Sequence, residues 1–482
     1  CALLDHHRCT GLDWPGNAET ALNNMEAAMT DVIATNRNTA ILGMGATGLS
    51  VARFLSSIGK SFVFADSRAA PPRLQEVMQK YPDTPLVLGA FDEQLFANLD
   101  QVIVSPGISL QEPALIAARG AGVNLIGDVE LFLEHAKAPV IAITGSNGKS
   151  TVTTLLGEMA IASELSVGIG GNLGTPMLDL LDDKRQLYVL ELSSFQLELL
   201  NDARGAITTL LNISPDHMDR YVGLQQYHAA KHRIFRGAGK VVVNREDPLT
   251  RPLLPSKTAM ISFGLNQPDL GDFGLLQGPV NGYLAMGAKR LMTVKDVAIK
   301  GTHNLANALA ALALGHSAEL PMQVMLDTLK TFKGLPHRCE NIAEINGALY
   351  IDDSKGTNVG ATLAAIKGFG EADCRNLILI AGGQSKGQDF SELQRAASDF
   401  VKHSILFGQD AAQIAETLNT VVDTRTVESL DAAVEQAHQL AAAGDIVLLS
   451  PACASFDMFS GFEERGRSFQ KAVQRLGGGN EY

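Results

Sequence analysis

The chain has 482 residues, of which 46% are hydrophobic and 19% charged. This composition is that of a globular protein and excludes a fibrous or largely disordered chain. The net charge of −13 and the pI of about 5.3 argue against a large nucleic-acid-binding or anionic-membrane-binding surface, although a few local lysines can still hold one phosphate group.

Length and cysteine usage narrow the class further. At about 150 residues per domain the chain predicts about three domains. The five cysteines are scattered and form no C-x-x-C pair, which favours a reduced protein over a disulfide scaffold or a zinc site. The sequence shows no signal peptide and no membrane-spanning apolar run, so we expect a cytoplasmic protein. We expect residues 1–28 to be extraneous, with the natural start at Met25 or Met29, because this stretch lacks clear periodicity.

The first predicted domain covers residues 29–127. The apolar run Thr39–Leu42 enters a glycine turn, a helix follows over 49–58, and SFVFAD (61–66) is the next strand. DQVIVSPGI (100–108) is a further buried strand that ends in a turn. Strands that alternate with helices indicate a parallel, Rossmann-like sheet with helices on its faces.

The second predicted domain covers residues 128–333. Strands are expected at 138–144, 186–191, 205–211 and 240–244, and helices at 150–163 and 304–320. The segment Ser262–Lys295 is rich in glycine and in short alternating runs, which predicts a small β-meander.

The third predicted domain covers residues 334–482. Its expected strands are ALYIDDS (348–354), NLILIAGG (376–383), SILFG (404–408) and GDIVLLSP (444–451), each followed by a helical pattern. The fold class is therefore α/β, with three domains of mostly parallel, helix-flanked sheets: Rossmann-like, then a P-loop ATPase, then Rossmann-like again. Ligands of such sheets bind at the carboxyl ends of the strands.

A short glycine loop follows the first strand of the second domain. AITGSNGKSTVTT (142–154) resembles a P-loop but has only two residues, not four, before its Gly-Lys-Ser. Gly145 and Gly148 allow close approach of a phosphate, Lys149 would reach the β- and γ-phosphates, and Ser150 or Thr151 would offer a hydroxyl to Mg²⁺. On these residues alone, a tight turn with an exposed lysine is an equally good interpretation.

A second glycine motif lies near the start of the chain. GMGATG (43–48), with Asp66 nearly twenty residues on, matches a dinucleotide fingerprint. Taken alone it suggests an NAD-dependent dehydrogenase, but amides at a helix N-terminus serve any nucleotide diphosphate.

Ordered blocks along the chain resemble the Mur ligase family. They are TGSNGKST, LELSSFQLE, NISPDHMDRY, YHAAKHRIF, GTHNLANALAALAL, GLPHRCE, DDSKGTNVGAT, GGQSK and LLSPACASFDMF, with GMGATGLS and SPGI in front of them. The resemblance covers about Thr39 to Gly477. It favours a real, shortened P-loop over a chance turn.

The resemblance implies an ATP-dependent amide ligase of cytoplasmic peptidoglycan precursor synthesis. Within the family, the blocks point to addition of D-glutamate to UDP-N-acetylmuramoyl-L-alanine through an acyl phosphate. ATP and two Mg²⁺ ions are the expected cofactors, and the protein is expected to be a monomer with small-molecule substrates and no nucleic-acid partner. The alternatives are a related amide ligase with a different amino-acid acceptor, an NAD-dependent oxidoreductase, and a non-catalytic nucleotide-binding protein.

The resemblance also assigns residues to the ATP and metal sites. Glu191 ends a buried strand, where a carboxylate is costly unless it meets a cation, and Lys231, a solvated helix lysine on sequence grounds alone, is the lysine that the family carbamylates. Catalysis is assigned to Lys149, His217 and Lys231. The metal ligands are Ser150, Glu191, His217 and carbamylated Lys231. The ATP residues are Gly145, Ser146, Asn147, Gly148, Lys149, Ser150, Thr151, Asn304, Asn307, Arg338, Asp353 and Lys355. Among them the resemblance places Asp353 at the ribose and Lys355 near the γ-phosphate.

Two further sets hold the other substrates. The family block usually reads G-G-D-G-K, and Gln384 replaces its aspartate here, which makes the detail of the amino-acid pocket uncertain. For the UDP substrate the resemblance implies Ala46, Thr47, Asp66, Ser67, Arg68, Ser105 and Gly107 at the UDP end, and Asn172, Ser193 and Gln196 at the muramoyl end. For D-glutamate it implies Thr357, Lys386, Ser455, Phe456 and Phe462.

Overall fold

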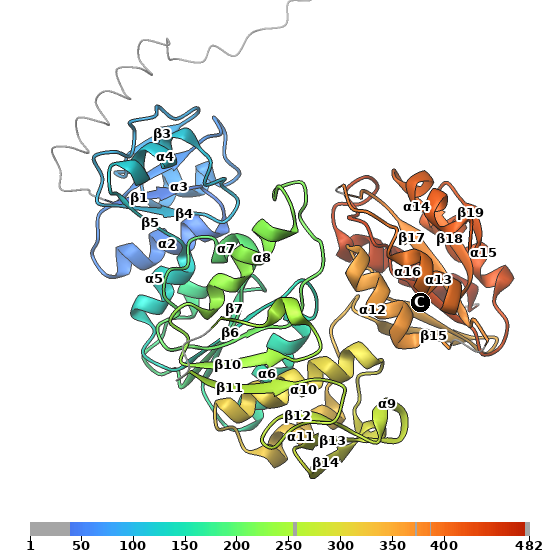
Figure 1. Ribbon diagram of the computed structural model, residues 1–482. Helices are drawn as coiled ribbons and strands as arrows, with labels where there is room; N and C mark the ends of the chain where they lie inside the picture. Colours follow the sequence, from blue (N-terminus) through green and yellow to red (C-terminus); the bar gives the residue numbers. More distant parts are fainter. Residues whose placement is uncertain (1–38, 254–257, 372–373, 386, 478–482) are drawn as a thin grey trace, which may run out of the picture. The chain divides into compact units, whose positions relative to one another are not determined.

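A computed structural model describes residues 39–253, 258–371, 374–385 and 387–477 (Figure 1). The expected extension, residues 1–28, lies outside the described residues, and so does Lys386. The chain divides into two compact units, with the boundary between Asp128 and Val129. The first unit holds one sheet and the second unit holds two.

The first unit is a five-stranded sheet in the order β3-β2-β1-β4-β5, with every neighbouring pair parallel. Both neighbours of β1 are crossover partners, which is the doubly wound pattern expected from strand–helix alternation. Its helix α2 begins at Ala46, three residues before the predicted start. The elements are β1 (Thr39–Leu42), α2 (Ala46–Ser57), β2 (Val63–Asp66), α3 (Leu74–Lys80), β3 (Leu86–Leu88), β4 (Gln101–Val104), α4 (Pro113–Gly120) and β5 (Asn124–Ile126).

The larger sheet of the second unit has nine strands in the order β14-β13-β12-β11-β10-β9-β6-β8-β7. Pairs are parallel from β7 to β12 and antiparallel in β12–β13–β14, which confirms the predicted meander. Its strands are β6 (Val140–Thr144), β7 (Val167–Gly171), β8 (Leu187–Glu191), β9 (Ile207–Leu210), β10 (Lys240–Asn244), β11 (Ala259–Phe263), β12 (Phe273–Leu276), β13 (Tyr283–Met286) and β14 (Lys289–Thr293). Its helices are α5 (Asp128–His135), α6 (Lys149–Ala162), α7 (Ser194–Leu197), α8 (Leu224–His232), α9 (Gly278–Asn281), α10 (Thr302–Ser317) and α11 (Met322–Thr331).

The smaller sheet of the second unit has six strands in the order β15-β16-β20-β17-β18-β19. Only β15 is antiparallel, and the sequence did not predict this half-exposed edge strand. The elements are β15 (Glu340–Ile345), β16 (Ala348–Asp352), α12 (Val359–Phe369), β17 (Leu377–Gly382), α13 (Leu393–Phe400), β18 (Val401–Phe407), α14 (Ala411–Leu418), β19 (Asp423–Thr426), α15 (Leu430–Leu440), β20 (Ile446–Leu449) and α16 (Phe462–Leu476).

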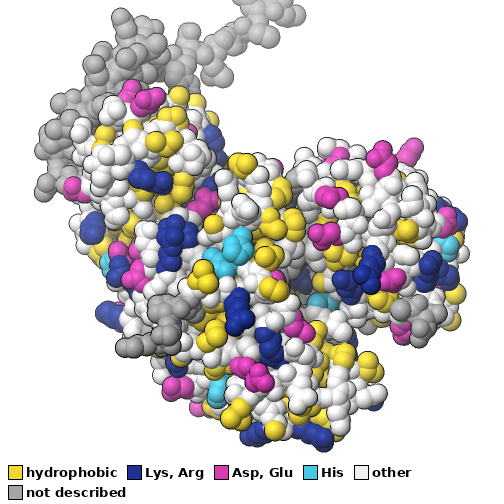
Figure 2. Space-filling model, in the orientation of Figure 1, with side chains coloured by type: hydrophobic (Ala, Val, Ile, Leu, Met, Phe, Trp, Pro, Cys, Tyr) yellow, Lys and Arg dark blue, Asp and Glu magenta, His cyan; other side chains and the backbone are white. Residues whose placement is uncertain are grey.

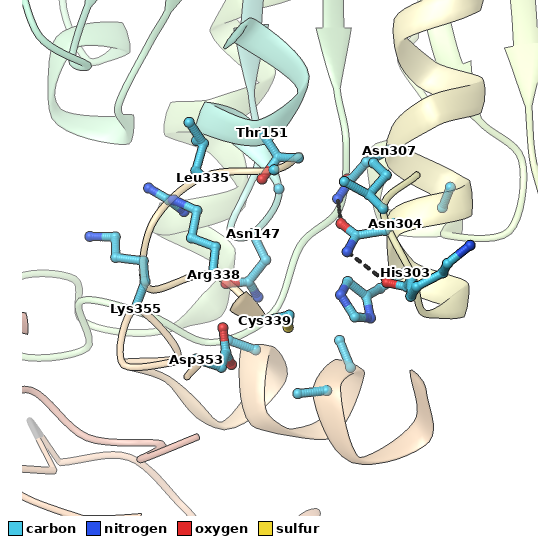
Figure 3. Close-up of a pocket in the computed structure, with 18 of the residues that line it drawn as sticks. Asn147, Thr151, His303, Asn304, Asn307, Leu335, Arg338, Cys339, Asp353 and Lys355 are labelled. Carbon is cyan, nitrogen blue, oxygen red and sulfur yellow. Dashed lines mark hydrogen bonds between the residues drawn. The ribbon is translucent and has the colours of Figure 1, made fainter. Parts of the chain in front are cut away.

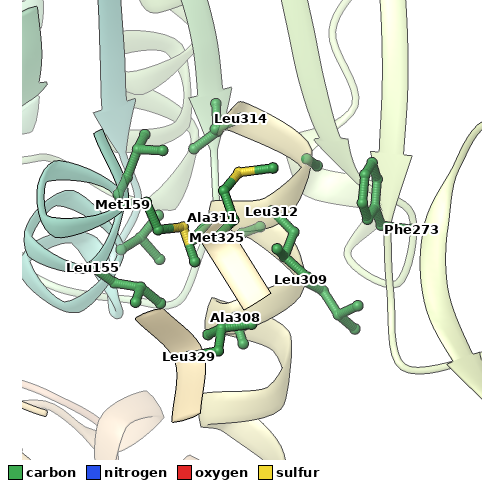
Figure 4. Packing of buried hydrophobic residues seen from close by; sticks show 14 of the residues in the cluster. Leu155, Met159, Phe273, Ala308, Leu309, Ala311, Leu312, Leu314, Met325 and Leu329 are labelled. Atoms are coloured by element: carbon green, nitrogen blue, oxygen red, sulfur yellow. The ribbon is translucent and has the colours of Figure 1, made fainter. Parts of the chain in front are cut away.

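The core under the phosphate-loop helix is built from α6, α10 and α11 (Figure 4). Leu155 and Met159 of α6 meet Leu312 of α10 and Leu329 of α11, and all four are fully buried. Each such side chain contributes about 1.5–3 kcal/mol through burial. A Cβ at Gly315 would lie 2.3 Å from Met325 Sδ, so glycine lets α10 and α11 pack closely. This packing fixes α6, and with it the loop at its start.

The charged side chains on the visible surface are mixed in sign. On the face shown in Figure 2, Lys and Arg side chains are interspersed with Asp and Glu, not gathered into one basic stripe. Among the described residues, no helix combines the length and apolar character needed to span a bilayer.

Candidate active site

The phosphate loop joins β6 to α6, in the setting that the sequence predicted. Gly148 has φ 81°, a conformation that side-chain-bearing residues rarely adopt, and a Cβ there would lie 2.5 Å from Asn307 Oδ1. Asn212 holds the loop from below: its Oδ1 accepts from the Asn147 amide at 2.8 Å, and its Nδ2 donates to the Asn147 carbonyl at 3.0 Å. The short loop is therefore rigid and opens directly onto a helix N-terminus.

Two lysines converge on this loop. Lys149 Nζ donates to the carbonyls of Gly145 and Ser146 at 2.9 and 3.0 Å, and Lys231 Nζ donates to Gly145 O at 2.8 Å. Burial, followed by the charge of Lys149, holds the pKa of Lys231 well below the usual lysine range. Lys231 is only 1% exposed, so its interpretation as a solvated helix lysine is wrong. The sequence pattern of α8 does not indicate this burial, because a lysine side chain on the inward face of a helix looks like an exposed one in sequence.

Glu191 ends β8 and is 2% exposed. Its Oε1 accepts a 2.6 Å hydrogen bond from Asn172 Nδ2, while Oε2 is buried and has no hydrogen-bond partner among the described residues. Burial raises the pKa of this carboxyl, but Lys149, Ser150 and Asn172 outweigh burial and lower it. A buried, ionised carboxylate with one free oxygen fits an oxygen-preferring cation such as Mg²⁺, with the Ser150 hydroxyl as a second hard donor.

His217 lies in the loop after β9 with φ 57°. Its ring packs edge-on against Phe195 at 4.8 Å, and its Nε2 lies 3.7 Å from Asp216 Oδ2. Arg220 Cζ lies over the Phe195 ring, 4.4 Å from its centroid, so Phe195 contacts both His217 and a guanidinium. The metal-binding role of His217 stays a prediction.

A cavity of about 450 Å³ lies beside the loop (Figure 3). Eight of the twelve predicted ATP residues line it, namely Asn147, Gly148, Thr151, Asn304, Asn307, Arg338, Asp353 and Lys355, whereas Gly145, Ser146, Lys149 and Ser150 are not among its lining residues. Asn304 and Asn307 lie on one face of α10, where Asn307 Nδ2 donates to Asn304 Oδ1 at 3.2 Å. The smaller sheet supplies Arg338, Asp353 and Lys355 to the same cavity. Arg338 Nη2 donates to Ser150 Oγ at 2.7 Å, which joins the two sheets directly at the phosphate loop.

Two groups in the cavity titrate near neutral pH. Burial raises the pKa of Asp353 to about 7, although Ser450 Oγ donates to its Oδ2 at 2.7 Å. Burial and the charges of Arg338 and Lys149 lower the pKa of Lys355 to about 8. Strongly shifted groups in a cleft are typical of a functional site.

The residues predicted for the amino acid have varied surroundings. Ser455 is buried, Phe456 is 68% exposed, and Phe462 lies under Lys355 Nζ at 4.3 Å. Gln384 pairs with Ala454 through two 2.9 Å main-chain hydrogen bonds, so its backbone is held independently of its side chain. The roles of these residues stay predictions, and Lys386 lies outside the described residues.

Two deeply buried residues were missed by sequence reasoning. Arg465 is fully buried and donates to Ser354 Oγ and O, Gly382 O and Cys453 O, which ties the ends of three strands together. Asn358 bridges the two sheets of the second unit. Nothing in their local sequence distinguishes them from an exposed helix arginine and a simple helix cap.

A cluster of one histidine and two carboxylates lies near the start of the smaller sheet, and its members are hydrogen-bonded. His337, Glu340 and Asp352 offer atoms within 4.8 Å of one another. His337 Nδ1 lies 2.7 Å from Asp352 Oδ2, and Gln470 Nε2 donates to both carboxylates. These contacts account for the cluster as a structural network.

Three residues predicted for the muramoyl end belong to the second unit. Asn172 donates to Glu191, as described above. Ser193 and Gln196 form a reciprocal capping box at the start of α7, in which Ser193 Oγ accepts from the Gln196 amide and Gln196 Oε1 accepts from the Ser193 amide. Asn172, which follows β7, thus reaches the carboxylate at the end of β8, and Ser193 and Gln196 lie just after that strand in the chain.

The first unit carries the other glycine motif. Asp66, at the end of β2, accepts from the Met44 amide at 2.8 Å and pairs with the Arg68 guanidinium at 2.7 and 2.8 Å. Burial raises the pKa of Asp66, but Arg68 and the Met44 amide outweigh it and hold the pKa low. Ala46 and Thr47 begin α2, while Ser105 and Gly107 follow β4 at the adjacent strand end. These residues share the carboxyl edge of one sheet.

Comparisons with known proteins agree along most of the chain. Residues 37–127 match the N-terminal domain of MurD-like Mur ligases, residues 143–315 the Mur ligase middle domain, and residues 337–453 the Mur ligase glutamate ligase domain. UDP-N-acetylmuramoylalanine–D-glutamate ligase of Pseudomonas aeruginosa is 51% identical over 445 residues, which cover 92% of this chain and 99% of the relative. The enzyme of the same name from Legionella pneumophila is 48% identical and covers 90% and 98%.

Solved structures share the fold at low sequence identity. MurF ligase from Thermotoga maritima, solved in complex with ADP, has a TM-score of 0.57 at 15% identity and covers 92% of this chain and 96% of its own. UDP-N-acetylmuramate–alanine ligase MurC from the same organism has a TM-score of 0.55 at 20% identity, with coverage of 91% and 99%. The three matched domains and the relatives at about half identity lead to one conclusion: the chain belongs to the Mur ligase family, in its MurD-like group.

Proposed function

We propose that this protein joins D-glutamate to UDP-N-acetylmuramoyl-L-alanine, with ATP converted to ADP and phosphate. The observation that carries this assignment is the convergence of Lys149, Lys231 and Glu191 on a phosphate loop. It occurs in a chain about half identical, over nearly its whole length, to ligases named for that reaction.

The first chemical step transfers the γ-phosphoryl group to the alanyl carboxylate and forms an acyl phosphate. Lys149 and the amides at the start of α6 offset the negative charge of the transferred group, and the buried setting strengthens this effect. The amine of D-glutamate then attacks the acyl carbon, the C–N bond forms, and phosphate leaves with the bonding electrons of the C–O bond. The amine proton is released to solvent.

Mg²⁺ is the expected metal, with Ser150, Glu191, His217 and carbamylated Lys231 as its ligands and two ions as the proposed number. When bound, the metal supplies positive charge that neutralises the phosphate oxygens. The neutral Lys231 amine can add CO₂, forming an N–C bond and releasing one proton, which turns a buried amine into an anionic ligand. The low pKa of Lys231 and the free Oε2 of Glu191 support this arrangement.

The three expected regions take separate roles in this proposal. Residues 29–127 bind the UDP moiety, 128–333 bind ATP, and 334–482 bind D-glutamate, with ATP held between the last two. The protein acts as a cytoplasmic monomer on small-molecule substrates.

The decisive experiment measures phosphate release from ATP and Mg²⁺ with UDP-N-acetylmuramoyl-L-alanine, with D-glutamate present or absent. Release that needs both substrates and yields a new UDP-linked product supports the proposal. Release that needs the sugar nucleotide but not D-glutamate would shift the acceptor to another amino acid, with the loop at Gln384 as the suspect. No release with any amino acid would refute the ligase activity.

The carbamate has its own test. Lys231→Ala should lose activity and regain part of it when a short carboxylate such as formate or acetate is added. Full activity of the unsupplemented variant would contradict the assignment. Lys240→Ala is a matched control, since this partly buried lysine donates to Ser317 O and lies 3.9 Å from Glu319 Oε1, and neither partner is assigned to the site.

A further inference from the structure

Besides the contact of Arg338 with Ser150, the two sheets of the second unit are joined through one buried side chain, Asn358. It is 3% exposed and forms the N-cap of α12, where its Oδ1 accepts from the Ala361 amide at 2.8 Å. Its Nδ2 donates to Asn147 Oδ1 in the phosphate loop and to Asp216 Oδ2, both at 3.2 Å. Two of these partners fix the orientation of the Asn358 side-chain amide. The Ala361 N–H must face its oxygen, and the Asp216 carboxylate must face its nitrogen.

The partners of Asn358 are parts of the phosphate site. Asn147 is in the glycine loop, and Asp216 directly precedes His217. The first turn of α12 packs closely against the loop after β9, since a Cβ at Gly360 would lie 2.4 Å from Ser214 Oγ. A displacement of α12 would therefore move both the glycine loop and the loop that carries His217.

A second buried amide continues the contact into the smaller sheet. Gln388 is 3% exposed, and its Oε1 accepts from the Val359 amide, the residue after Asn358, at 3.0 Å. Its Nε2 donates to Ser385 O at 2.9 Å and, at longer range, to Ala452 O and Thr357 O at 3.4 and 3.5 Å. One side chain thus holds three loop segments that the proposed function assigns to the amino-acid site or its immediate neighbours.

We propose that Asn358 and Gln388 are a pair of positioning residues that hold the amino-acid loops in register with the phosphate loop. The inference rests on the proposed function for the identity of the amino acid, but not for the contact itself. Neither residue needs to touch a substrate. The pair couples occupancy of one site to the geometry of the other through the hydrogen bonds of the two side chains, which meet at the peptide bond between Asn358 and Val359.

The test uses ATP affinity as the readout, because Gln388 contacts no residue assigned to ATP. Gln388→Glu keeps an oxygen for the Val359 amide but turns a carboxylate towards three carbonyls. We expect it to weaken ATP binding, measured by titration calorimetry without the other substrates, by about three- to tenfold. Gln388→Met removes donor and acceptor without adding charge and should act in the same direction.

Asn358→Ser separates capping from bridging. Serine can still cap α12 but is too short to reach Asn147 and Asp216. We expect the Asn358→Ser, Gln388→Glu double variant to bind ATP within about twofold of Asn358→Ser alone, since the second change acts only through the first. Gln394→Glu is the matched control: this exposed glutamine of α13 donates to Thr420 Oγ1 and should leave ATP affinity unchanged.

The outcomes separate this inference from the proposed function. Wild-type ATP affinity in both Gln388 variants, or effects that multiply in the double variant, would overturn the pairing. Thermal unfolding of each variant shows whether a loss of ATP affinity comes from misfolding. If Gln388→Glu is misfolded, the ATP affinity of Gln388→Met decides whether the pairing exists. A wild-type protein that binds ATP but makes no product with D-glutamate would refute the proposed function, and the binding measurements would still decide the pairing.

Discussion

Two glycine loops in this chain share one backbone plan and differ in the charges around them. Each follows a buried parallel strand and opens a helix, β1 to α2 in the first unit and β6 to α6 in the second. In both, the backbone requires a glycine: a Cβ at Gly48 would lie 1.9 Å from Gly43 O, and Gly148 has φ 81°, which L side chains rarely adopt. The helix N-terminus favours an anion in both places.

The difference lies in how charge is buried. Around the second loop, Lys149 and Lys231 approach loop carbonyls and share the site with the buried carboxylate of Glu191. Around the first loop, the described residues place no lysine, and Asp66 pairs with a guanidinium whose side chain is 54% exposed. The backbone that the two loops share therefore accounts for anion binding at both. Phosphoryl transfer at the second loop requires, in addition, buried charged side chains beside the loop.

The largest expected effect comes from removing that charge. Lys149→Met should lower kcat by about 10³-fold, because the transferred phosphoryl group loses a preorganised cation. Steady-state kinetics with all three substrates measures it. Lys137→Met, which removes an exposed ion pair with Asp183, should leave kcat unchanged. A Lys149→Met variant within tenfold of wild type would show that the loop amides suffice and that the comparison is wrong.

At the first loop, packing should matter more than charge. Gly48→Ala should destabilise the first unit by about 3 kcal/mol, because its Cβ would overlap the Gly43 carbonyl and the backbone must shift. Thermal unfolding measures this loss. Gly45→Ala is the control, since a Cβ there has nothing within 4 Å, and it should change stability by less than about 0.5 kcal/mol. Equal stability of the two variants would contradict the packing argument.

The sequence predicted the strands and glycine loops of this fold well, because buried parallel strands form continuous apolar runs bounded by glycine. It did not predict β7, which contains three glycines, or the three-residue edge strands β3 and β5. It also did not predict the edge strands β15 and β19, whose residues are half exposed or exposed and lack a clear apolar pattern. These strands are defined by their neighbours in the sheet, and tertiary pairing of this kind is not visible in local propensity.

Site residues divide in a similar way. Lys149 and Glu191 could be predicted, because a lysine in a glycine loop and a carboxylate at the end of a buried strand are locally unusual. Lys231 needed the family resemblance, since its burial results from packing of α8 against β6 and the loop. Asn358 escaped both approaches, because its partners Asn147 and Asp216 are 211 and 142 residues away in sequence.

A smaller effect should follow from breaking the ion pair at the first loop. Arg68→Met should raise the KM for the UDP substrate by about tenfold and leave kcat unchanged, because it removes binding that is equal in the ground and transition states. Initial rates at varied UDP-substrate concentration measure both constants. Arg73→Met, which removes only an exposed pair with Glu76, should leave both unchanged. A fall in kcat equal to the fall in kcat/KM would give the first loop a role in catalysis.

The smallest expected effect is a pH dependence that the two loops do not share. Asp353 becomes ionised above about pH 7 and can then accept hydrogen bonds from a ribose, so nucleotide affinity should rise as pH increases through that value. Lys355 loses its proton above about pH 8, so affinity for a γ-phosphate should fall again. For single titrations with these pKa values, each limb changes affinity by about threefold between half a unit below and half a unit above its midpoint.

Calorimetric titrations with ATP and ADP across this range distinguish the two groups. The fall in affinity above about pH 8 should be present for ATP and weak for ADP, because Lys355 is assigned to the γ-phosphate. The rise in affinity near pH 7 has two sources, Asp353 and the nucleotide's own phosphate, and Asp353→Asn should remove only the first. Affinity for UDP-N-acetylmuramoyl-L-alanine, whose diphosphate is esterified at both ends and does not titrate in this range, should be nearly constant from about pH 6.5 to 8.5. The reason is that the mutual pairing of Asp66 and Arg68 lowers the pKa of the first and raises the pKa of the second. A matching bell-shaped curve for this substrate would mean that the charges at the first loop are as poorly neutralised as those at the second, and the distinction between a binding loop and a reactive loop would fail.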